Sequence, residues 1–450
     1  MTTESSSLAV AIVGAGPAGI YAADILGELA PGTRVDIFEK LPTPYGLIRY
    51  GVSPDHPRIK RIVDALHEVL DGSAVRLFCD VEIGADITVA ELRSRYDAVI
   101  IATGALRDVP FDLPGVDLPG SFGSADFVAW YDSHPELPAT WHFGAESVAV
   151  IGAGNVALDV TRMLIKPAHT LADTDIAPNV MAALAANPVR DVHVYARRGP
   201  ADTRFSATEL RELGQQVDVD VIVDPADMVP DPHVERMTRQ FAPTRQVVEI
   251  LRRWSQIPTA ERTASRRAHL HFYRIPSALL GTTKVEGLRT ERAVPDGYGH
   301  ITGSGEYEDH PVQAVYRAVG YAAAPLEGVP FDASTHTVPH RAGAVLDGHG
   351  RTIPGLYVTG WIKRGCVGLI GSTKSDARQT VETLLGDQAL GKGRRGADEL
   401  VRERGLKPID WNGWLRIDAA ERALGASLER ARTKIADRTE LVRLGRVSGA

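Results

Sequence analysis

The chain has 450 residues, of which 44% are apolar, and carries a formal net charge of −7. This length is too great for one hydrophobic core and indicates two or three domains, and the negative charge argues against general nucleic-acid binding. The two cysteines, Cys79 and Cys366, form no redox or metal-binding pair. The sequence has no long apolar run and no apolar signal core, so we expect no membrane anchor. The two distant cysteines favour a reducing cytoplasm and no metal site.

The opening strand, residues 9–13, runs directly into a glycine-rich turn and then an amphipathic helix. In this turn Gly14 makes the tight bend, Gly16 lets a pyrophosphate approach the backbone, and Gly19 lets the helix pack on the strand. The next strand ends in Glu39, about 20 residues further on, where an acid binds the hydroxyl groups of an adenosine ribose. These elements in register predict a site for an adenosine with free hydroxyls, as in FAD.

Residues 40–57 contain four prolines, which forbid a continuous helix or strand. A loop that follows the ribose-binding acid lies where it could cover a bound dinucleotide. Two interpretations of His56 stay open. It is either a side chain of the reaction centre, or a packing residue beside Asp55, which would cap the helix that follows.

A second buried strand, residues 96–101, ends in Ala102-Thr103-Gly104. Small residues at the end of such a strand let the backbone approach a ligand. The alternative is an ordinary core strand with a turn glycine, but the opening motif favours the ligand. A stretch rich in proline and glycine, residues 113–120, then breaks the chain and indicates a domain boundary.

A second fingerprint follows, in which the strand at 147–151 leads into residues 152–157, Gly-Ala-Gly-Asn-Val-Ala. The strand after this unit arrives late, behind an insertion at 167–188, and ends in Arg197 and Arg198 instead of an acid. Guanidinium groups bind phosphate with two donors, whereas an acid repels it. The second site is therefore predicted to prefer NADP over NAD, although a solvated arginine pair is the alternative.

The remainder of the middle region holds three weaker signals. Ser206 and Glu209 have the spacing of a helix capping box, and strand-like stretches from 271 to 315 suggest an antiparallel addition. Residues 231–274 contain nine arginines and four acids. This excess suggests a docking face for an acidic partner, with scattered solvated arginines as the alternative.

The chain then returns to a buried strand near residues 354–359, followed by a glycine-rich segment and a helix from about Thr373 to Leu385. Glycines there let backbone N–H groups reach a flavin ring, and the helix N-terminus favours a negative charge on it. Trp361 either stacks beside the cofactor or fills the core. Residues 386–450 form a C-terminal extension with no assignable chemistry.

The chain resembles the adrenodoxin-reductase type of ferredoxin–NADP reductase, including its actinobacterial members. The matching blocks follow the order of that family over about the first 385 residues. They are GAGPAG at 14–19, PTPYGLIRYGVSPDHP at 42–57, GAGNVALDV at 152–160, RRGP at 197–200, ELREL at 209–213 and GWIKRG at 360–365.

The resemblance implies cofactor contacts at defined positions. For FAD they are Ala18, Glu39, Leu47, Ile83, Trp361, Gly368, Leu369 and Ile370. For NADP they are Ala153, Gly154, Asn155, Val156, Arg197, Arg198, Glu209 and Gly368. It also implies that His56 and Glu212 lie near the nicotinamide and that Arg211 lies in a region that docks the iron–sulfur partner. The sequence departs from the family pattern in two places. Cys366 replaces the usual proline, and the resemblance does not cover the residues after about 386.

Together these observations predict an α/β flavoprotein with two Rossmann-like dinucleotide-binding domains, the NADP domain inserted into the FAD domain. We expect the FAD domain at 1–107 and 326–385, the NADP domain at 108–325 and an extension at 386–450. The expected reaction passes a hydride from NADPH to FAD and single electrons to a ferredoxin-type protein. The alternatives are a flavin monooxygenase, a general diaphorase and a non-catalytic NADP sensor. A thioredoxin-reductase-like enzyme would need a cysteine pair that the sequence lacks.

Overall fold

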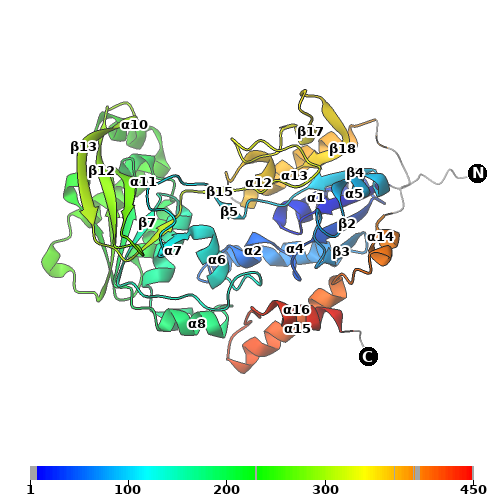
Figure 1. The fold of residues 1–450 in the computed structure, drawn as a ribbon, viewed down its shortest axis with the longest axis horizontal. Helices are drawn as coiled ribbons and strands as arrows, with labels where there is room; N and C mark the ends of the chain where they lie inside the picture. The colour runs from blue at the N-terminus through cyan, green and yellow to red at the C-terminus, as the bar shows by residue number, and fades with distance from the viewer. Residues whose placement is uncertain (1–7, 229–230, 369, 389, 391–395, 448–450) are drawn as a thin grey trace, which may run out of the picture.

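The computed structural model describes residues 8–228, 231–368, 370–388, 390 and 396–447, which form two lobes and a C-terminal extension (Figure 1). Among these residues, no helix combines the length and the apolar character needed to cross a bilayer.

The first lobe is built on a seven-stranded sheet with the order β16-β17-β18-β4-β1-β2-β3. Its five strands from β18 to β3 are parallel, and β16 and β17 add an antiparallel edge. The β1 strand is buried at every position, as the run of small and β-branched residues predicts. The strands are β1 (Ala9–Val13), β2 (Arg34–Glu39), β3 (Val75–Cys79), β4 (Ala98–Ile101), β16 (His340–Arg341), β17 (Ala344–Leu346) and β18 (Thr352–Val358).

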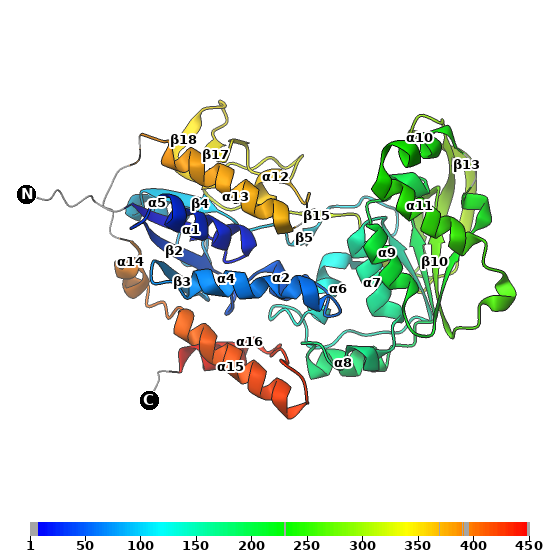
Figure 2. The ribbon, with the colours of Figure 1, turned by 180° about the vertical axis from the view of Figure 1, so that it is seen from behind.

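Two helices from opposite ends of the chain, α1 and α13, lie side by side against this sheet (Figures 1 and 2). The α13 helix begins at Ile370, three residues before the predicted start at Thr373. The proline-rich stretch is broken as expected, with one short helix between Pro44 and Pro54 and another that begins at Pro57. The helices of this lobe are α1 (Pro17–Leu29), α2 (Leu47–Tyr50), α3 (Pro57–Lys60), α4 (Ile62–Leu70), α5 (Val89–Arg95), α12 (Trp361–Arg364) and α13 (Ile370–Leu385).

The second lobe is built on a six-stranded parallel sheet with the order β6-β14-β7-β8-β10-β9. A three-stranded antiparallel sheet, β11-β12-β13, is attached to it, as the sequence predicts for 271–315. The strands are β6 (Ser121–Gly123), β7 (Ser147–Ile151), β8 (Asp191–Tyr195), β9 (Val219–Val223), β10 (Arg266–His271), β11 (Arg274–Leu280), β12 (Gly287–Pro295), β13 (Ile301–His310) and β14 (Ala314–Arg317).

Helices α7, α9 and α11 of the second lobe pack on one face of its parallel sheet, and residues of β11 and β12 pack on the other. Phe127, Trp130 and Trp141 pack with one another and with other aromatic rings beside the sheet. The helices are α6 (Ser124–Tyr131), α7 (Asn155–Ile165), α8 (Pro178–Ala185), α9 (Ala207–Gly214), α10 (Pro232–Gln240) and α11 (Ala242–Ser255), with short 3₁₀ turns at Ala168–Leu171, Pro200–Asp202, Pro225–Asp227 and Thr259–Glu261.

The chain passes between the lobes twice, at β5 (Arg107–Asp108) and β15 (Tyr321–Ala322), and these two strands pair antiparallel. The whole second sheet therefore lies between two halves of the first in sequence. This confirms the predicted fold class of two Rossmann-like units, one inserted into the other. The residue boundaries assigned from the sequence stay a prediction.

In its described part, the C-terminal extension forms three helices, α14 (Asp398–Glu403), α15 (Trp411–Ser427) and α16 (Arg438–Arg446). Trp414, Ile417 and Leu441 from α15 and α16 are buried in the core of the first lobe. Ile409 pairs with Cys79 at the end of β3 through two backbone hydrogen bonds of 2.9 Å. The extension is thus an integral layer under the first lobe (Figure 1).

Candidate functional site

The three glycines of the first turn have different surroundings, since two are closely packed and one faces open space. A Cβ on Gly14, whose φ is +112°, would lie 2.5 Å from the carbonyl oxygen of Ala102, and one on Gly19 would lie 2.1 Å from that of Gly14. A Cβ on Gly16 would meet no atom within 4 Å. The turn therefore leaves room where the fingerprint brings a pyrophosphate to the backbone.

Glu39 ties this turn to the end of β2. Its Oε2 accepts the N–H of Ala15 at 2.9 Å, and its Oε1 accepts the N–H of Leu41 at 3.0 Å. Burial raises the pKa of Glu39, although both backbone hydrogen bonds act against the rise. An acceptor-rich acid beside the turn fits an adenosine ribose with free hydroxyls.

The loop after Glu39 lies directly on the turn. Tyr45 donates its N–H to the carbonyl of Ala15 at 2.8 Å. Gly46 has a φ of +49°, and a Cβ there would lie 3.1 Å from the Cα of Gly16. The proline-rich stretch is therefore held against the open phosphate position, which is where the sequence suggests a cover for a dinucleotide.

The remaining positions assigned to FAD come from several elements of the first lobe. Ala18 packs on Gly360, where an added Cβ would approach the Ala18 Cβ to 2.7 Å. Trp361 is half-buried at the start of α12, and Gly368 is exposed. Leu47 at the start of α2 is half-buried and Ile83 is buried. Leu369 lies outside the described residues, and Ile370 is described only as the first residue of α13.

The second glycine turn repeats the geometry of the first. Gly152 has a φ of +151°, and its Cβ would lie 2.3 Å from the carbonyl oxygen of Ala318. A Cβ on Gly154 would meet no atom within 4 Å, and Ala157 is fully buried at the third position. The second lobe therefore also presents an open backbone position at the start of a helix, α7, which favours a phosphate.

Arg197 and Arg198 follow β8 and are both exposed. Their loop folds back onto the glycine turn, since Arg204 donates its N–H to the carbonyl of Ala153 at 2.7 Å. Asn155 accepts the N–H of Ser206 at 2.9 Å. The turn, the arginine loop and the start of α9 thus form one connected edge, which also carries Val156.

The two lobes meet at His56, which is 8% exposed and precedes α3. Its Nε2 lies 3.1 Å from Asp159 Oδ1 and 3.5 Å from Glu209 Oε2, and its Nδ1 lies 3.5 Å from Glu212 Oε2. All three acids belong to the second lobe. The structure therefore brings together His56, Glu209 and Glu212, which the sequence singled out, and adds Asp159.

Arg162, fully buried on α7, sits at the centre of this cluster. It donates to Glu209 Oε2 at 2.9 Å and to Asp159 Oδ1 at 2.5 Å, and it contacts His56 Nε2. Sequence reasoning missed Asp159 and Arg162. Their spacing of three residues within the predicted helix is the one signal that could have paired them.

Asp55 does not cap the following helix, so that interpretation is wrong. Its carboxylate accepts from Ser53 Oγ at 2.6 Å, Arg162 Nε at 3.1 Å and Lys166 Nζ at 2.8 Å. Burial acts to raise the pKa of Asp55, but the charges of Arg162 and Lys166 outweigh it and lower the pKa. Asp55 is therefore a second ionic link between the lobes, beside His56.

Protons can reside at this centre. Burial opposes the charged imidazole, but the hydrogen bond and charge of Asp159 outweigh it and raise the pKa of His56. Burial and the neighbouring Asp159 carboxylate also raise the pKa of Glu209. His56 and Glu209 therefore hold their protons to higher pH than isolated side chains do, as suits groups that handle protons.

Among the residues that the structure describes, two clusters have the composition of a metal site. The ligating atoms of His56, Glu209 and Glu212 lie within 4.8 Å of one another, but the Arg162 guanidinium already supplies the positive charge there. The same spacing joins Asp191, His193 and His269. There Arg267 donates to both carboxylate oxygens of Asp191, at 2.7 and 2.9 Å, and takes the place of a cation.

The arginine-rich stretch 231–274 does not form one uniform basic face. Arg267 pairs with Asp191, Arg274 pairs with the buried Asp227, and Arg239 pairs with Glu235 on the same helix. The first two of these pairs join different elements of the domain, and the third lies within one helix. Arg211 is exposed on α9, next to Glu212 of the interdomain cluster.

Comparison with known proteins agrees with this geometry. Residues 8–223 match the family model for pyridine nucleotide-disulphide oxidoreductases. The NADPH-ferredoxin reductase FprA of Mycobacterium tuberculosis is 38% identical over 97% of this chain and 98% of its own length. The mitochondrial NADPH:adrenodoxin oxidoreductase of Bos taurus is 33% identical over 98% and 93%. The solved structure of Mycobacterium tuberculosis FprA in complex with NADPH superposes with a TM-score of 0.89, covering 98% of this chain and 99% of that one.

Proposed function

Because this chain belongs to the family of NADPH–ferredoxin reductases of the adrenodoxin-reductase type, we propose that it oxidises NADPH and reduces a ferredoxin-type iron–sulfur protein. The observation that carries the proposal is the pair of glycine turns, one in each lobe, that are both open at the second glycine. Bound FAD supplies the redox chemistry, because a flavin accepts a hydride and releases electrons singly.

The chain's own residues bind and orient the two nucleotides. The turn at Gly14 to Gly19 and Glu39 hold the adenosine diphosphate part of FAD. The turn at Gly152 to Val156 holds the pyrophosphate of NADPH, and Arg197 and Arg198 bind its 2′-phosphate through charge-assisted hydrogen bonds.

At the meeting point of the lobes, His56 and Glu212 orient the nicotinamide and exchange protons with solvent. Glu212 is half-exposed, whereas His56 and Glu209 are buried. The buried guanidinium group of Arg162 pairs with Asp159 and Glu209 and holds both side chains in place. A proton held at His56 can thus reach solvent through Glu212, 3.5 Å away.

The partner docks through positive charges near Arg211, and the excess arginines of 231–274 extend that surface. Attraction between oppositely charged surfaces steers association. This attraction weakens as salt rises, because the Debye length shortens from about 10 Å at 0.1 M to about 3 Å at 1 M. Ferredoxin reduction should therefore slow with salt while ferricyanide reduction changes little.

The reaction is assigned to the cytoplasm, as the two distant cysteines suggest.

A direct test is to purify the protein with FAD and measure NADPH oxidation with a panel of ferredoxins and cytochrome c as the final acceptor. We expect rapid turnover that depends on ferredoxin. NADPH oxidation that requires an added organic substrate would support a flavin monooxygenase instead. A colourless protein without hydride transfer would support a nucleotide sensor and overturn the proposal.

A further inference from the structure

The segment between α15 and α16, residues 428–437, lies where the two lobes meet. Successive residues in it pack into different cores, since Ile435 packs against the core of the first lobe and Ala436 against that of the second. In Figure 2 the α15 helix runs along the first lobe, and its C-terminal end approaches α8 of the second. The reaction proposed above assigns no role to this segment.

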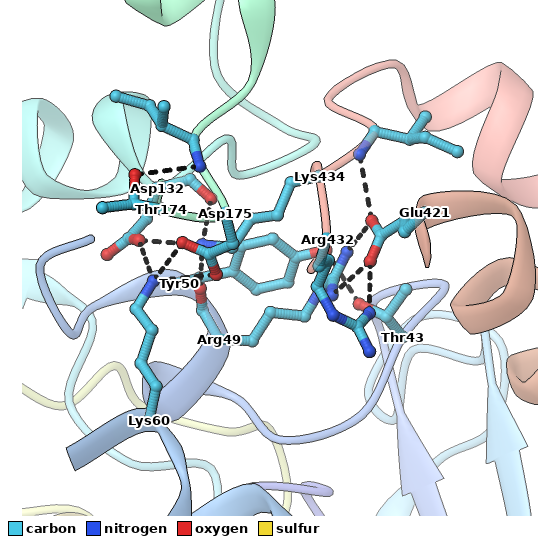
Figure 3. Close-up of polar contacts among 12 residues, drawn as sticks. Thr43, Arg49, Tyr50, Lys60, Asp132, Thr174, Asp175, Glu421, Arg432 and Lys434 are labelled. Carbon is cyan, nitrogen blue, oxygen red and sulfur yellow. Dashed lines mark hydrogen bonds and ion pairs between the residues drawn. The ribbon is translucent and has the colours of Figure 1, made fainter. Parts of the chain in front are cut away.

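Lys434 joins three parts of the chain (Figure 3). Its backbone N–H donates to the carbonyl of Asp175 at 2.9 Å. Its Nζ donates to the carbonyl of Arg49 at 2.6 Å and to Asp132 Oδ1 at 2.8 Å. The residue is 2% exposed, so this ammonium group is held entirely by the protein.

Lys60 of the first lobe completes the cluster. Its Nζ donates to Asp132 Oδ1 at 3.1 Å and to Asp175 Oδ1 at 2.9 Å. Two lysines, one from the first lobe and one from the extension, thus balance two aspartates from the second lobe. Arg430 adds another link, because its Nη1 donates to the carbonyl of Ile176 at 3.0 Å.

The segment is also fixed to the first lobe on either side of Lys434, through Glu421, which is fully buried on α15. Glu421 pairs with Arg49 and with Arg432, the latter at 2.8 Å. It also accepts the N–H of Ile435 at 2.9 Å. The segment is therefore anchored on the first lobe and reaches the second through Lys434 and Arg430.

This network connects to the reaction centre through α3. Lys60 is the last residue of α3, and His56 is its N-cap. The N–H of Lys60 donates to the carbonyl of His56 at 3.1 Å. The same short helix thus contacts the second lobe at both ends, through His56 with Asp159 and through Lys60 with Asp175.

Such a cluster acts on geometry more than on stability. Taking charges out of water opposes the Coulomb attraction, so a buried ion pair contributes little net stability but requires a defined arrangement. Domains joined by two crossings move relative to each other unless their interface prevents it. Hydride transfer needs reacting atoms within about 3–3.5 Å, and a shift of about 1 Å costs about 100-fold in rate.

We propose that residues 428–437 form an interdomain brace and that Lys434 is a positioning residue, which sets how the NADP domain sits on the FAD domain for hydride transfer. The kinetic part of this inference rests on the proposed function. The brace itself is a property of the two domains and is measurable without NADPH.

The main variant is Lys434→Met, which keeps the length of the side chain and removes its charge. Lys434→Arg is the conservative rescue. Arg443→Met is the matched control, because Arg443 lies on α16 of the same extension and pairs only with the nearby Glu440 among its described partners. Arg430→Gln weakens the same bridge without leaving buried acids unpaired, and it serves if Lys434→Met does not fold.

The first readout is stopped-flow reduction of the FAD-loaded protein by NADPH. We expect Lys434→Met to lower the limiting rate about 10- to 100-fold, with the Kd for NADPH within about threefold, because the proposed pyrophosphate and 2′-phosphate contacts all lie in the second lobe. Arg430→Gln should lower the rate less, and Lys434→Arg should recover most of it. A folded Lys434→Met at the wild-type rate, a loss confined to Kd, or a Lys434→Arg as slow as Lys434→Met would overturn the proposal.

The second readout is hydrogen exchange of the peptide spanning 430–436. The brace predicts faster exchange in Lys434→Met and Arg430→Gln and no change in Arg443→Met, whereas unchanged exchange in both brace variants would overturn it. Photochemical reduction of the bound flavin, which needs no NADPH, should be equal in all variants. If the wild-type protein oxidises no NADPH, the proposed function fails, and hydrogen exchange still decides whether the brace exists.

Discussion

Substitutions of two glycines in the first turn allow the effect on the fold to be measured separately from the effect on cofactor binding. Gly14 and Gly16 lie two residues apart in one turn, but only Gly14 has a positive φ, +112°, and a near neighbour for a Cβ, at 2.5 Å. Gly16 has φ −80° and ψ 178°, which any residue adopts. Gly14→Ala should therefore damage the fold, whereas Gly16→Ala should damage only the phosphate site.

The magnitudes follow from these contacts. A strained positive φ costs about 1–3 kcal/mol, and an overpacked methyl costs about 1–3 kcal/mol more. Gly14→Ala should thus destabilise the apoprotein by about 2–6 kcal/mol. Gly16→Ala should cost it less than about 1 kcal/mol, the scale of a changed helix N-cap. If a pyrophosphate occupies the open position, the same overpacking weakens FAD binding about 5- to 150-fold.

The assay compares unfolding of the two apoproteins with FAD titration followed by flavin fluorescence. Gly154→Ala is the matched control in the second lobe, since it also has an open Cβ position, and it should spare FAD while weakening NADPH. The reasoning would be refuted if Gly16→Ala bound FAD as tightly as the wild type. Equal destabilisation of the Gly14 and Gly16 variants would refute it as well.

Three further predictions concern the second lobe and the interdomain centre. Arg197→Ala with Arg198→Ala should raise KM for NADPH at least about tenfold, the scale of a lost charge-assisted hydrogen bond, and leave KM for NADH nearly unchanged; equal rises would remove the 2′-phosphate assignment. Arg162→Met leaves Asp55, Asp159 and Glu209 without their shared cation, so the free energy of unfolding measured in urea should fall by about 3–5 kcal/mol. A fall below about 1 kcal/mol would contradict this role. The raised pKa of His56 means that its charged form stabilises the fold fully below the unfolded pKa of about 6.5. That contribution disappears as pH rises through the folded pKa. The difference in free energy of unfolding between wild type and His56→Gln should therefore narrow above pH 6.5, and a difference that widens there would contradict the prediction.

The sequence predicted the elements whose causes are local. A buried strand, a turn that needs glycine and a helix that packs closely are all specified within about twenty residues, so both glycine turns could be placed. The third position shows the limit of this reasoning. In the first turn a Cβ on Gly19 would lie 2.1 Å from a backbone oxygen, whereas the second turn accommodates the buried Ala157.

Capping gives a similar lesson at the start of α9. Ser206 accepts the N–H of Glu209 at 3.2 Å, as the pattern predicts. The return half of the box is replaced, because the N–H of Ser206 donates to Asn155 and the Glu209 side chain reaches Arg162. The Glu209 side chain could bond the N-terminus of its own helix, but it pairs instead with the buried Arg162 of α7. Nothing in the local sequence pattern indicates this pairing.

Charges that cross between domains could not be predicted, for a physical reason. A buried ion is tolerated only when partners surround it, and those partners need no sequence spacing. Glu421 meets Arg49, 372 residues away, and Lys434 meets Asp132, 302 residues away. A composition scan counts such residues as solvated surface, and so the extension carried no signal. The consequence is that the part of the chain with no recognisable motif holds several of the contacts that join the two lobes.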